Sequence, residues 1–598
     1  MKRLARGWSV LTVTALVAAC ASQDEAQRPP VENEGIAGKP VPPPQSQDAA
    51  VDEIAVTANQ VENRAVSPQA DAPSPSLRRE ADKSMVLSAG ASASYIVPAA
   101  PDCCYSPPYQ QSTNTERYQH LDESPVRLVA EQPVSTFSID VDTGAYANVR
   151  RFLNAGQLPP QDAVRVEEMI NYFDYQYAAP DSRATPFRVN TELAHAPWNQ
   201  QSMLLKIGIK GFDIAASERP PANLVFLIDV SGSMQSPDKL PLLKNAFRLL
   251  TDQLTAKDRV SMVVYAGSSG VVLEPTAGDE KHKIRAAIDR LEAGGSTNGA
   301  AGIQQAYDLA HSAQIKNGIN RVVLATDGDF NVGIVNFESL LDLAERQRES
   351  GVALTTLGFG TGNYNDQLLE RLADAGNGNY SYVDTLTEAR KVLVSELSST
   401  LFTIAKDVKI QVEFNPAEVL EYRLIGYENR ALAREDFNND KVDAGDIGAG
   451  HRITALYEIV PAGGKGRIDP LRYGSRQESA GKAGEIANVR LRYKKPDSDT
   501  SQLLEYPIAK NSLVSAQQMS ADFRFAASVA AFGQILRGGK YVGSYSYDDV
   551  AALAKGAYGD DGEGYRREFV SLVKLAATLA PAQRREAERV GQVDKTGP

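Results

Sequence analysis

Apolar runs and helical segments alternate strictly through the middle of the chain, from residue 223 to about residue 398. Wholly apolar runs at Leu224–Ile228 and Val260–Tyr265 are separated by segments such as Lys239–Leu254, in which apolar residues recur every three or four positions. Strands that are apolar throughout must be covered on both faces, and amphipathic helices between them supply that cover. The pattern therefore predicts an α/β fold with a doubly wound, mostly parallel sheet.

Segments on both sides of this region carry the period-two pattern of half-buried strands. The runs lie at residues 187–194 and 203–209 before the α/β region and at 408–414, 422–427, 452–460 and 488–493 after it. Helices are predicted from just after Thr143 to Asn154 and at 162–173, and again at 521–535 and 565–579. We therefore expect the α/β domain to be inserted between β-rich segments that together complete one β layer, followed by a helical C-terminal region.

The first twenty residues have the composition of a targeting segment. Three basic residues lie within the first six positions, and the apolar stretch Trp8–Val17 is too short to span a bilayer. Small residues then lead to Cys20, and this pattern resembles the bacterial lipoprotein signal. The resemblance implies that Cys20 is acylated and anchors the chain in the cell envelope. Because Ala21 and Ser22 follow it, the expected destination is the outer membrane, on its periplasmic or surface face; an ordinary signal peptide is the alternative.

Composition divides the rest of the chain and excludes some classes of protein. Residues 21–127 are rich in Pro, Ala, Ser and Gln without any period, which predicts a disordered tether. Cys103 and Cys104 lie within it, and no chemistry is assigned to them. Three cysteines in 598 residues exclude a disulfide-built scaffold. A formal net charge of -12, with no segment that concentrates Lys and Arg, argues against nucleic acid as a partner.

These boundaries give five predicted parts. They are a signal peptide at 1–20, the tether at 21–127, an N-terminal domain at 128–215, the α/β domain at 222–400, and a C-terminal sandwich-like and helical domain at 405–590. Ligands of an open α/β sheet collect at the carboxyl ends of its strands. The functional residues are therefore expected in the loops that follow the strands of residues 222–400.

Three loops of this α/β region are rich in oxygen-bearing side chains. The loop Asp229–Ser233 follows the first apolar strand directly, Gly294–Thr297 precedes a helix, and Ala325–Asp329 follows another strand. Each loop alone is also what a turn or a helix cap would show. Hard oxygen ligands in this combination suit Mg2+, with Mn2+ and Ca2+ as alternatives.

Together the loops resemble the metal-ion-dependent adhesion site (MIDAS) of von Willebrand factor type A and integrin inserted domains, in which Asp-x-Ser-x-Ser is followed by Thr and then by Asp. The matching positions are Asp229, Ser231, Ser233, Thr297 and Asp327. The resemblance implies that the three hydroxyls contact the metal, while the two carboxylates act partly through water. It also implies that a Glu or Asp of a protein partner completes the metal's ligands.

The resemblance extends over residues 115 to 590, to a bacterial lipoprotein family with a von Willebrand A core and its own N- and C-terminal domains. It implies a membrane-anchored protein that mediates Mg2+-dependent protein-protein binding or adhesion. Five histidines in no ligand spacing, and the absence of HExxH, GxSxG and Walker motifs, predict that the chain is not an enzyme. A Mg2+-dependent hydrolase and a structural scaffold without functional metal are the alternatives.

A second acidic loop offers a separate candidate for a cation. Asp436, Asn438, Asp440 and Asp443 space oxygen ligands much as calcium loops do. The loop departs from the EF-hand because Lys441 stands where Gly is needed and because Ile447 replaces the closing Glu. A turn between two strands is the alternative interpretation.

Overall fold

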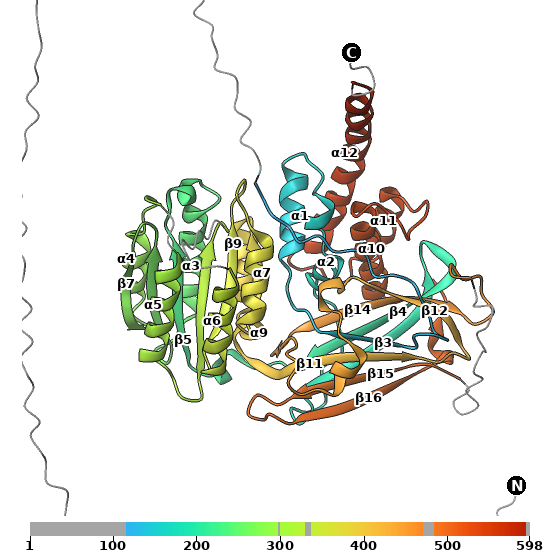
Figure 1. The fold of residues 1–598 in the computed structure, drawn as a ribbon, viewed down its shortest axis with the longest axis horizontal. Coiled ribbons are helices and arrows are strands. Elements are labelled where there is room, and N and C mark those ends of the chain that lie inside the picture. The colour runs from blue at the N-terminus through green and yellow to red at the C-terminus, as the bar shows by residue number, and fades with distance from the viewer. Residues whose placement is uncertain (1–114, 297–298, 329–336, 470–483, 594–598) are drawn as a thin grey trace, which may run out of the picture. The chain divides into compact units, whose positions relative to one another are not determined.

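The computed structural model describes residues 115–593, apart from 297–298, 329–336 and 470–483 (Figure 1). Cys20, Cys103, Cys104 and Thr297 therefore lie outside the described residues, as do the predicted signal peptide and the tether up to residue 114. Residues 115–127, which composition assigns to the tether, are described. They contact the folded part, because Thr115 and Arg117 make backbone hydrogen bonds with Gly362 and Tyr364.

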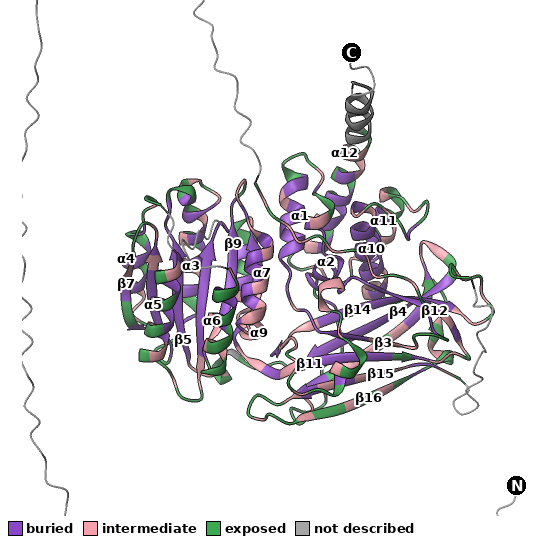
Figure 2. Cartoon of the chain, in the orientation of Figure 1, coloured by how far each residue is buried: buried purple, intermediate pink, exposed green. Residues whose placement is uncertain are grey.

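The middle of the chain forms a six-stranded sheet with the strand order β10-β9-β8-β5-β6-β7. All neighbouring strands are parallel except β7, which runs antiparallel to β6 at the sheet edge. The strands are β5 (Ala222–Asp229), β6 (Arg259–Tyr265), β7 (Ser269–Ala277), β8 (Ile319–Thr326), β9 (Ala353–Phe359) and β10 (Tyr380–Val383). Central strands β5 and β8 are buried along almost their whole length, as the wholly apolar runs require (Figure 2).

Helices cover both faces of this sheet, which confirms the predicted doubly wound α/β domain. One apolar core contains α3 (Leu240–Gln253) and α4 (Lys281–Asp289), together with the irregular C-terminal helical stretch α8 (Leu386–Arg390) to α9 (Leu397–Leu401). A separate core contains α5 (Gly299–Ser312), α6 (Phe337–Glu349) and α7 (Asp366–Ala375). The two cores lie on opposite faces, since Phe226 and Leu227, which are adjacent on β5, belong to different cores.

Strands from before and after the α/β domain build a β-sandwich together, which confirms the predicted insertion. One sheet has the order β1-β12-β14-β4-β3-β17, so that β4 pairs directly with β14. Its strands are β1 (Arg127–Leu128), β3 (Phe187–Ala196), β4 (Asn199–Gly211), β12 (Val419–Ile425), β14 (Arg452–Pro461) and β17 (Leu513–Val514). The other sheet comprises β2 (Val134–Ser138), β11 (Thr403–Phe414), β13 (Ile447–Gly448), β15 (Glu485–Lys494) and β16 (Ser501–Ala509).

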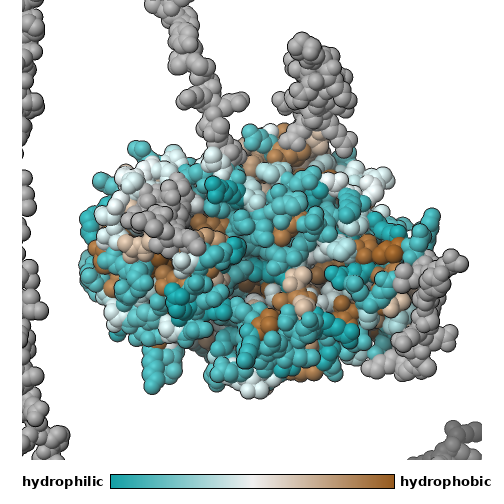
Figure 3. All heavy atoms as spheres, viewed as in Figure 1, coloured by the Kyte–Doolittle hydropathy of each residue, from teal (hydrophilic) through white to brown (hydrophobic). Residues whose placement is uncertain are grey.

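A helical layer covers the outer face of the sheet that contains β4. It consists of α1 (Gly144–Asn154), α2 (Val166–Asn171), α10 (Ala521–Leu536), α11 (Tyr547–Lys555) and α12 (Tyr565–Val593). Leu204 packs into the helical core, whereas its neighbour Leu205 packs into the sandwich core. No helix of the described residues is long and apolar enough to cross a membrane. Figure 3 shows that the face seen in this view is mostly hydrophilic, with smaller hydrophobic patches.

The predicted helix at 162–173 is broken in the structure. A short 3-10 turn at Gln161–Ala163 precedes α2, and Arg165 between them has extended backbone angles of φ -95° and ψ 111°. The extended backbone lets the Arg165 guanidinium donate to Asp366 of the α/β domain, at 2.5 Å. The helix that local periodicity predicts is therefore broken at a residue that forms an ion pair between domains.

Two further arginines join the α/β domain to the rest of the protein. Arg150 of α1 is buried and pairs with Glu388 at 2.7 Å and with Asp384 at 2.5 Å. Arg430, from the loop after β12, pairs with Asp374 of α7 at 2.6 Å. A buried guanidinium is stable only while its carboxylates stay in place, so these pairs make the contact between domains specific.

We expect the stability of the protein to depend on Glu167 of α2 as pH rises. Burial, followed by the charges of Glu428 and Asp140, raises the pKa of this carboxyl to about 8. Between its ordinary value of 4.5 and about 8, the folded protein keeps a proton that the unfolded chain has lost, so stability falls with rising pH. Glu167→Gln should remove this loss, which is on the order of 3 kcal/mol.

The measurement is the free energy of unfolding at pH 5 and pH 8 for wild type and variant. Glu345→Gln, on the exposed side of α6, is the matched control and should retain the wild-type pH dependence. Equal pH dependence in wild type and Glu167→Gln would show that the buried carboxyl does not titrate as expected.

Candidate metal centre

Two of the predicted metal-binding carboxylates emerge side by side at the carboxyl edge of the parallel sheet. β5 ends at Asp229, and Asp327 follows the last residue of β8. The two strands are parallel neighbours, with Ile228 opposite Ala325. Both residues are 0% exposed although they lie at the ends of their strands, Asp229 as the last residue of β5 and Asp327 just after β8. The sheet therefore positions two buried acids at one place, which is the arrangement expected from the sequence.

The loop after β5 holds the first carboxylate and two hydroxyls in a fixed arrangement. The backbone N–H of Ser231 donates to Oδ1 of Asp229 at 2.9 Å. The other oxygen, Oδ2, accepts from the hydroxyl of Thr326 at 2.9 Å and from that of Tyr265 at 3.3 Å. Oγ of Ser231 and Oγ of Ser233 lie 3.0 Å apart. Ser231 is buried and Ser233 is exposed, so the hydroxyl pair leads from the buried acid to the surface.

The loop that leads to Thr297 starts against the same loop. The N–H of Gly294 donates to the carbonyl of Val230 at 2.8 Å, and the N–H of Gly232 donates to the carbonyl of Gly295 at 3.1 Å. Gly295 has a φ of +84°, which glycine adopts without steric cost. The structure thus brings together Asp229, Ser231, Ser233 and Asp327. Thr297 lies two residues beyond Gly295 and outside the described residues.

A lysine that the sequence analysis did not single out lies in this site. Nζ of Lys239, the residue before α3, lies 2.9 Å from Oδ2 of Asp327. The same ammonium donates to Oδ1 of Asn363 at 2.9 Å, and Asn363 in turn donates to Oδ2 of Asp327 at 3.1 Å. No local signal marks Lys239, because a lysine near a helix terminus is usually a solvated surface residue.

The first described residues of the chain fix the loop that carries Asn363. The backbone N–H groups of Thr115 and Arg117 donate to the carbonyls of Gly362 and Tyr364, at 2.8 and 2.9 Å. The N–H of Gly362 donates to Oε1 of Glu116 at 2.9 Å. Asn363 lies between these anchored residues, so its contact with Asp327 depends on a segment more than two hundred positions away in sequence.

The electrostatics of the site suit a divalent cation. Burial raises the pKa of Asp229 to about 6; hydrogen bonds from Ser231 and Thr326 oppose this shift, and the charge of Asp327 adds to it. Two like charges in a buried site repel each other, and a cation between them would relieve the repulsion. Carboxylate and hydroxyl oxygens are the hard ligands that Mg2+ prefers, so the residues present fit this ion.

The second candidate, the acidic loop after β12, is occupied by cationic side chains of the protein itself. A guanidinium nitrogen of Arg492 lies 3.1 Å from Asp440, and one of Arg348 lies 2.6 Å from Asp443. Nζ of Lys409 donates to the carbonyl of Asp436 at 3.2 Å. Within the described residues, no group of three or more His, Cys, Asp or Glu side chains is placed to hold a metal. These contacts favour a structural turn over a calcium site.

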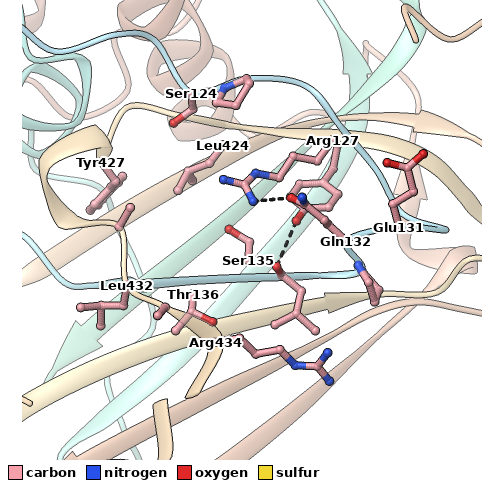
Figure 4. Close-up of a pocket in the computed structure, with 16 residues that line it drawn as sticks. Ser124, Arg127, Glu131, Gln132, Ser135, Thr136, Leu424, Tyr427, Leu432 and Arg434 are labelled. Carbon is pink, nitrogen blue, oxygen red and sulfur yellow. Dashed lines mark hydrogen bonds between the residues drawn. The ribbon is translucent and has the colours of Figure 1, made fainter. Parts of the chain in front are cut away.

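A pocket of about 320 Å³ lies in the sandwich, between residues 124–136 and the region of β12 and residues 431–434 (Figure 4). Arg127 extends across it and donates to Gln132 at 2.5 Å. None of the residues that line this pocket belongs to the loops of the metal site. It therefore contributes nothing to the chemistry at the sheet edge.

Comparison with known proteins supports the class of domain that this geometry indicates. The family model described as von Willebrand factor type A domain matches residues 223–395, and one described as von Willebrand factor matches residues 112–206. The model described as "Uncharacterized protein YfbK, C-terminal" matches residues 399–579. The chain is therefore a protein with a von Willebrand factor type A domain (VWA domain) and a family-specific C-terminal part.

One relative covers most of the chain. The Escherichia coli (strain K12) protein YfbK is 51% identical over 470 residues, which are 77% of this chain and 81% of that protein. The chain belongs to the family of YfbK. The Synechocystis protein sll0103 is 25% identical over 56% of this chain and 76% of its own length. A solved structure of a von Willebrand factor type A protein from Catenulispora acidiphila, 16% identical, covers 66% of this chain and 91% of its own with a TM-score of 0.37.

We expect the loop after β8 to tolerate no side chain at Gly328, the residue after Asp327. Gly328 has a φ of +86°, and a Cβ there would lie 2.3 Å from the backbone nitrogen of Asn365. Gly328→Ala should therefore lower the free energy of unfolding by about 2 kcal/mol or more, measured by thermal or denaturant unfolding. Gly270→Ala is the control, because its Cβ would meet no atom within 4 Å. A loss no greater than that of the control would contradict the expectation.

Proposed function

We propose that this protein is a lipid-anchored envelope protein that binds protein partners through a Mg2+ ion held by Asp229, Ser231, Ser233, Thr297 and Asp327. One observation carries the proposal: two buried carboxylates and a pair of hydroxyls lie together at the carboxyl edge of a parallel sheet. Ligand sites of open α/β sheets lie at this edge. VWA domains as a class serve in protein-protein interaction and adhesion, which agrees with this use of the site.

Some residues of the site orient its carboxylate, and others lie where a metal and a partner would make contact. Thr326 and Tyr265 hold the carboxylate of Asp229 through its Oδ2, while the exposed Ser233 lies toward the surface. When bound, Mg2+ supplies positive charge at the surface that accepts a further oxygen ligand. A glutamate or aspartate of a partner protein is the ligand of matching charge. The partner's acid would reach the site from the side on which Ser233 is exposed.

A lipid on Cys20 would hold this binding site at a membrane surface, in our proposal at the outer membrane, facing the periplasm or the cell surface. Lipid anchoring restricts the protein to partners within reach of the membrane. The function that results is charge-based recognition in the envelope. A Mg2+-dependent hydrolase at the same site would turn over a substrate, and a scaffold without functional metal would lose nothing when the metal is removed.

We expect Asp229→Ala to weaken metal uptake strongly and to abolish partner binding without unfolding the domain. The purified wild type should bind Mn2+ or Mg2+ in a calorimetric titration, and Asp229→Ala should show at least a tenfold loss of affinity. Crosslinking in intact cells should then reveal partners that disappear in Asp229→Ala and after treatment with EDTA. The matched control is Asp308→Ala, because Asp308 is an exposed acid of α5.

Three results would each count against this function. Absence of metal uptake by the wild type would contradict the proposed metal site. An unchanged set of partners in Asp229→Ala would favour a structural scaffold without functional metal. Mg2+-dependent turnover of a phosphoester would favour the hydrolase. A circular dichroism spectrum and a melting curve in EDTA establish that the variant is folded.

We expect Cys20→Ala to release the protein from the membrane. The acyl chains on Cys20 are the proposed anchor, and no helix in the described part of the chain can replace them as a membrane span. In Triton X-114 partitioning of cell extracts, the wild type should enter the detergent phase and Cys20→Ala the aqueous phase. Ser22→Ala, two residues further on, serves as the control and should behave as the wild type. Partition of Cys20→Ala into detergent would contradict the lipid anchor.

A further inference from the structure

We propose that Lys239 is a built-in cation of the metal site, which lowers its affinity for the metal and thereby leaves the loaded site with a positive charge for an acidic partner. The proposal rests on the function proposed above and names the residue that sets its specificity. Its basis is the ammonium group of Lys239, which lies 2.9 Å from Asp327 and 2.9 Å from Asn363. Neither contact is part of the predicted metal-binding motif.

Burial of the Lys239 charge at this position costs free energy unless an opposite charge in the site compensates it. Its side chain is only 7% exposed, whereas lysine is seldom buried without a partner. It also occupies the N-cap of α3, where the positive end of the helix dipole repels a cation. Helix stability therefore does not explain this lysine. The buried carboxylate of Asp327 explains the position of Lys239, because it is the opposite charge within contact distance.

The surrounding chain leaves room for the lysine. Gly360, at the end of β9, has a φ of +74°, and a Cβ on it would lie 2.2 Å from Cε of Lys239. Any residue other than glycine at position 360 would displace the lysine stem. Asn363 and the space left by Gly360 thus position the ammonium beside Asp327.

The charge balance of the site depends on this residue. Asp229 and Asp327 each bring one negative charge, the hydroxyls bring none, and Lys239 brings one positive charge. A divalent ion without the lysine would leave the site neutral. With the lysine, the loaded site carries one positive charge. A positive site attracts the carboxylate of a partner more strongly than a neutral site does. Lys239 therefore lowers the affinity of the site for the metal and raises its affinity for an acidic partner.

The test is a calorimetric titration of Mn2+ and Mg2+ into wild type and Lys239→Gln. Glutamine keeps a hydrogen-bond donor toward Asp327 but removes the charge, so we expect the metal affinity to rise at least about tenfold. Lys257→Gln, an exposed lysine before β6 at the opposite edge of the sheet, makes the same change in net charge and should leave the affinity unchanged. Lys239→Met is the second uncharged variant, in case Lys239→Gln does not fold, and melting curves in EDTA check both.

The partner side of the proposal uses acetate as the probe. Acetate is titrated into the Mn2+-loaded proteins, and displacement of metal-bound water is measured by proton relaxation. We expect acetate to bind several-fold more weakly to Lys239→Gln than to the wild type. Unchanged or weaker metal affinity in a folded Lys239 variant, or unchanged acetate affinity, would overturn the role of Lys239. Absence of metal uptake by the wild type would instead overturn the proposed function itself, so the two failures are distinct.

Discussion

The burial of two carboxylates at one sheet edge is the constraint around which this domain is organised. Removing an ionised acid from water costs several kcal/mol unless hydrogen bonds and opposite charge compensate it. Asp229 is compensated mainly by the Ser231 N–H and by the Thr326 and Tyr265 hydroxyls, and Asp327 by Lys239. One lysine charge faces two acids, so the edge remains negative. A cation bound at such an edge would stabilise the folded domain, which supports the proposed metal site.

The same physical rule explains how the inserted domain is held. The chain passes from the sandwich into the VWA domain before β5 and returns at β11, and these two crossings alone do not fix an orientation. Arg150, Arg165 and Arg430 add buried ion pairs between the domain and the elements around it. Each guanidinium would lose buried carboxylate partners if the domain moved away, and this loss would be unfavourable. The partners that would remain are Glu568 for Arg150, Glu168 for Arg165, and Asp140 and Asp142 for Arg430. The pairs therefore act together, and the VWA domain is part of a larger folded unit.

Patterns that repeat along the sequence predicted the structure well, and features that depend on distant residues were missed. Strand β6 and helix α10 were predicted within one residue of their observed ends, because uninterrupted periodicity defines them. Strand β16 was not predicted, since Leu503 and Leu504 break the alternation and Pro507 is rare within strands. Helix α11 was missed because the Gly- and Tyr-rich residues before it look like a loop, although Ser546 and Asp549 form a capping box. The helix at 162–173 was predicted as continuous because the local sequence gives no signal of the extended backbone at Arg165 or of its ion pair with Asp366.

The metal site shows the same division between local motif and distant support. Four of its candidate residues could be named from sequence because they lie at or just after the ends of β5 and β8, and these parallel neighbours bring their loops together. The fifth, Thr297, lies in the loop before α5 and was named from the motif alone. The charges around these residues could not be predicted, because they come from segments distant in sequence. Lys239 precedes a helix, Asn363 follows β9, and the segment at Thr115 fixes the loop of Asn363. The motif alone contains two acids, whose charges a divalent ion would balance to zero. The folded chain adds the positive charge of Lys239 and anchors the loop of Asn363. In the proposal made above, this charge sets how strongly a metal-loaded site attracts an anion.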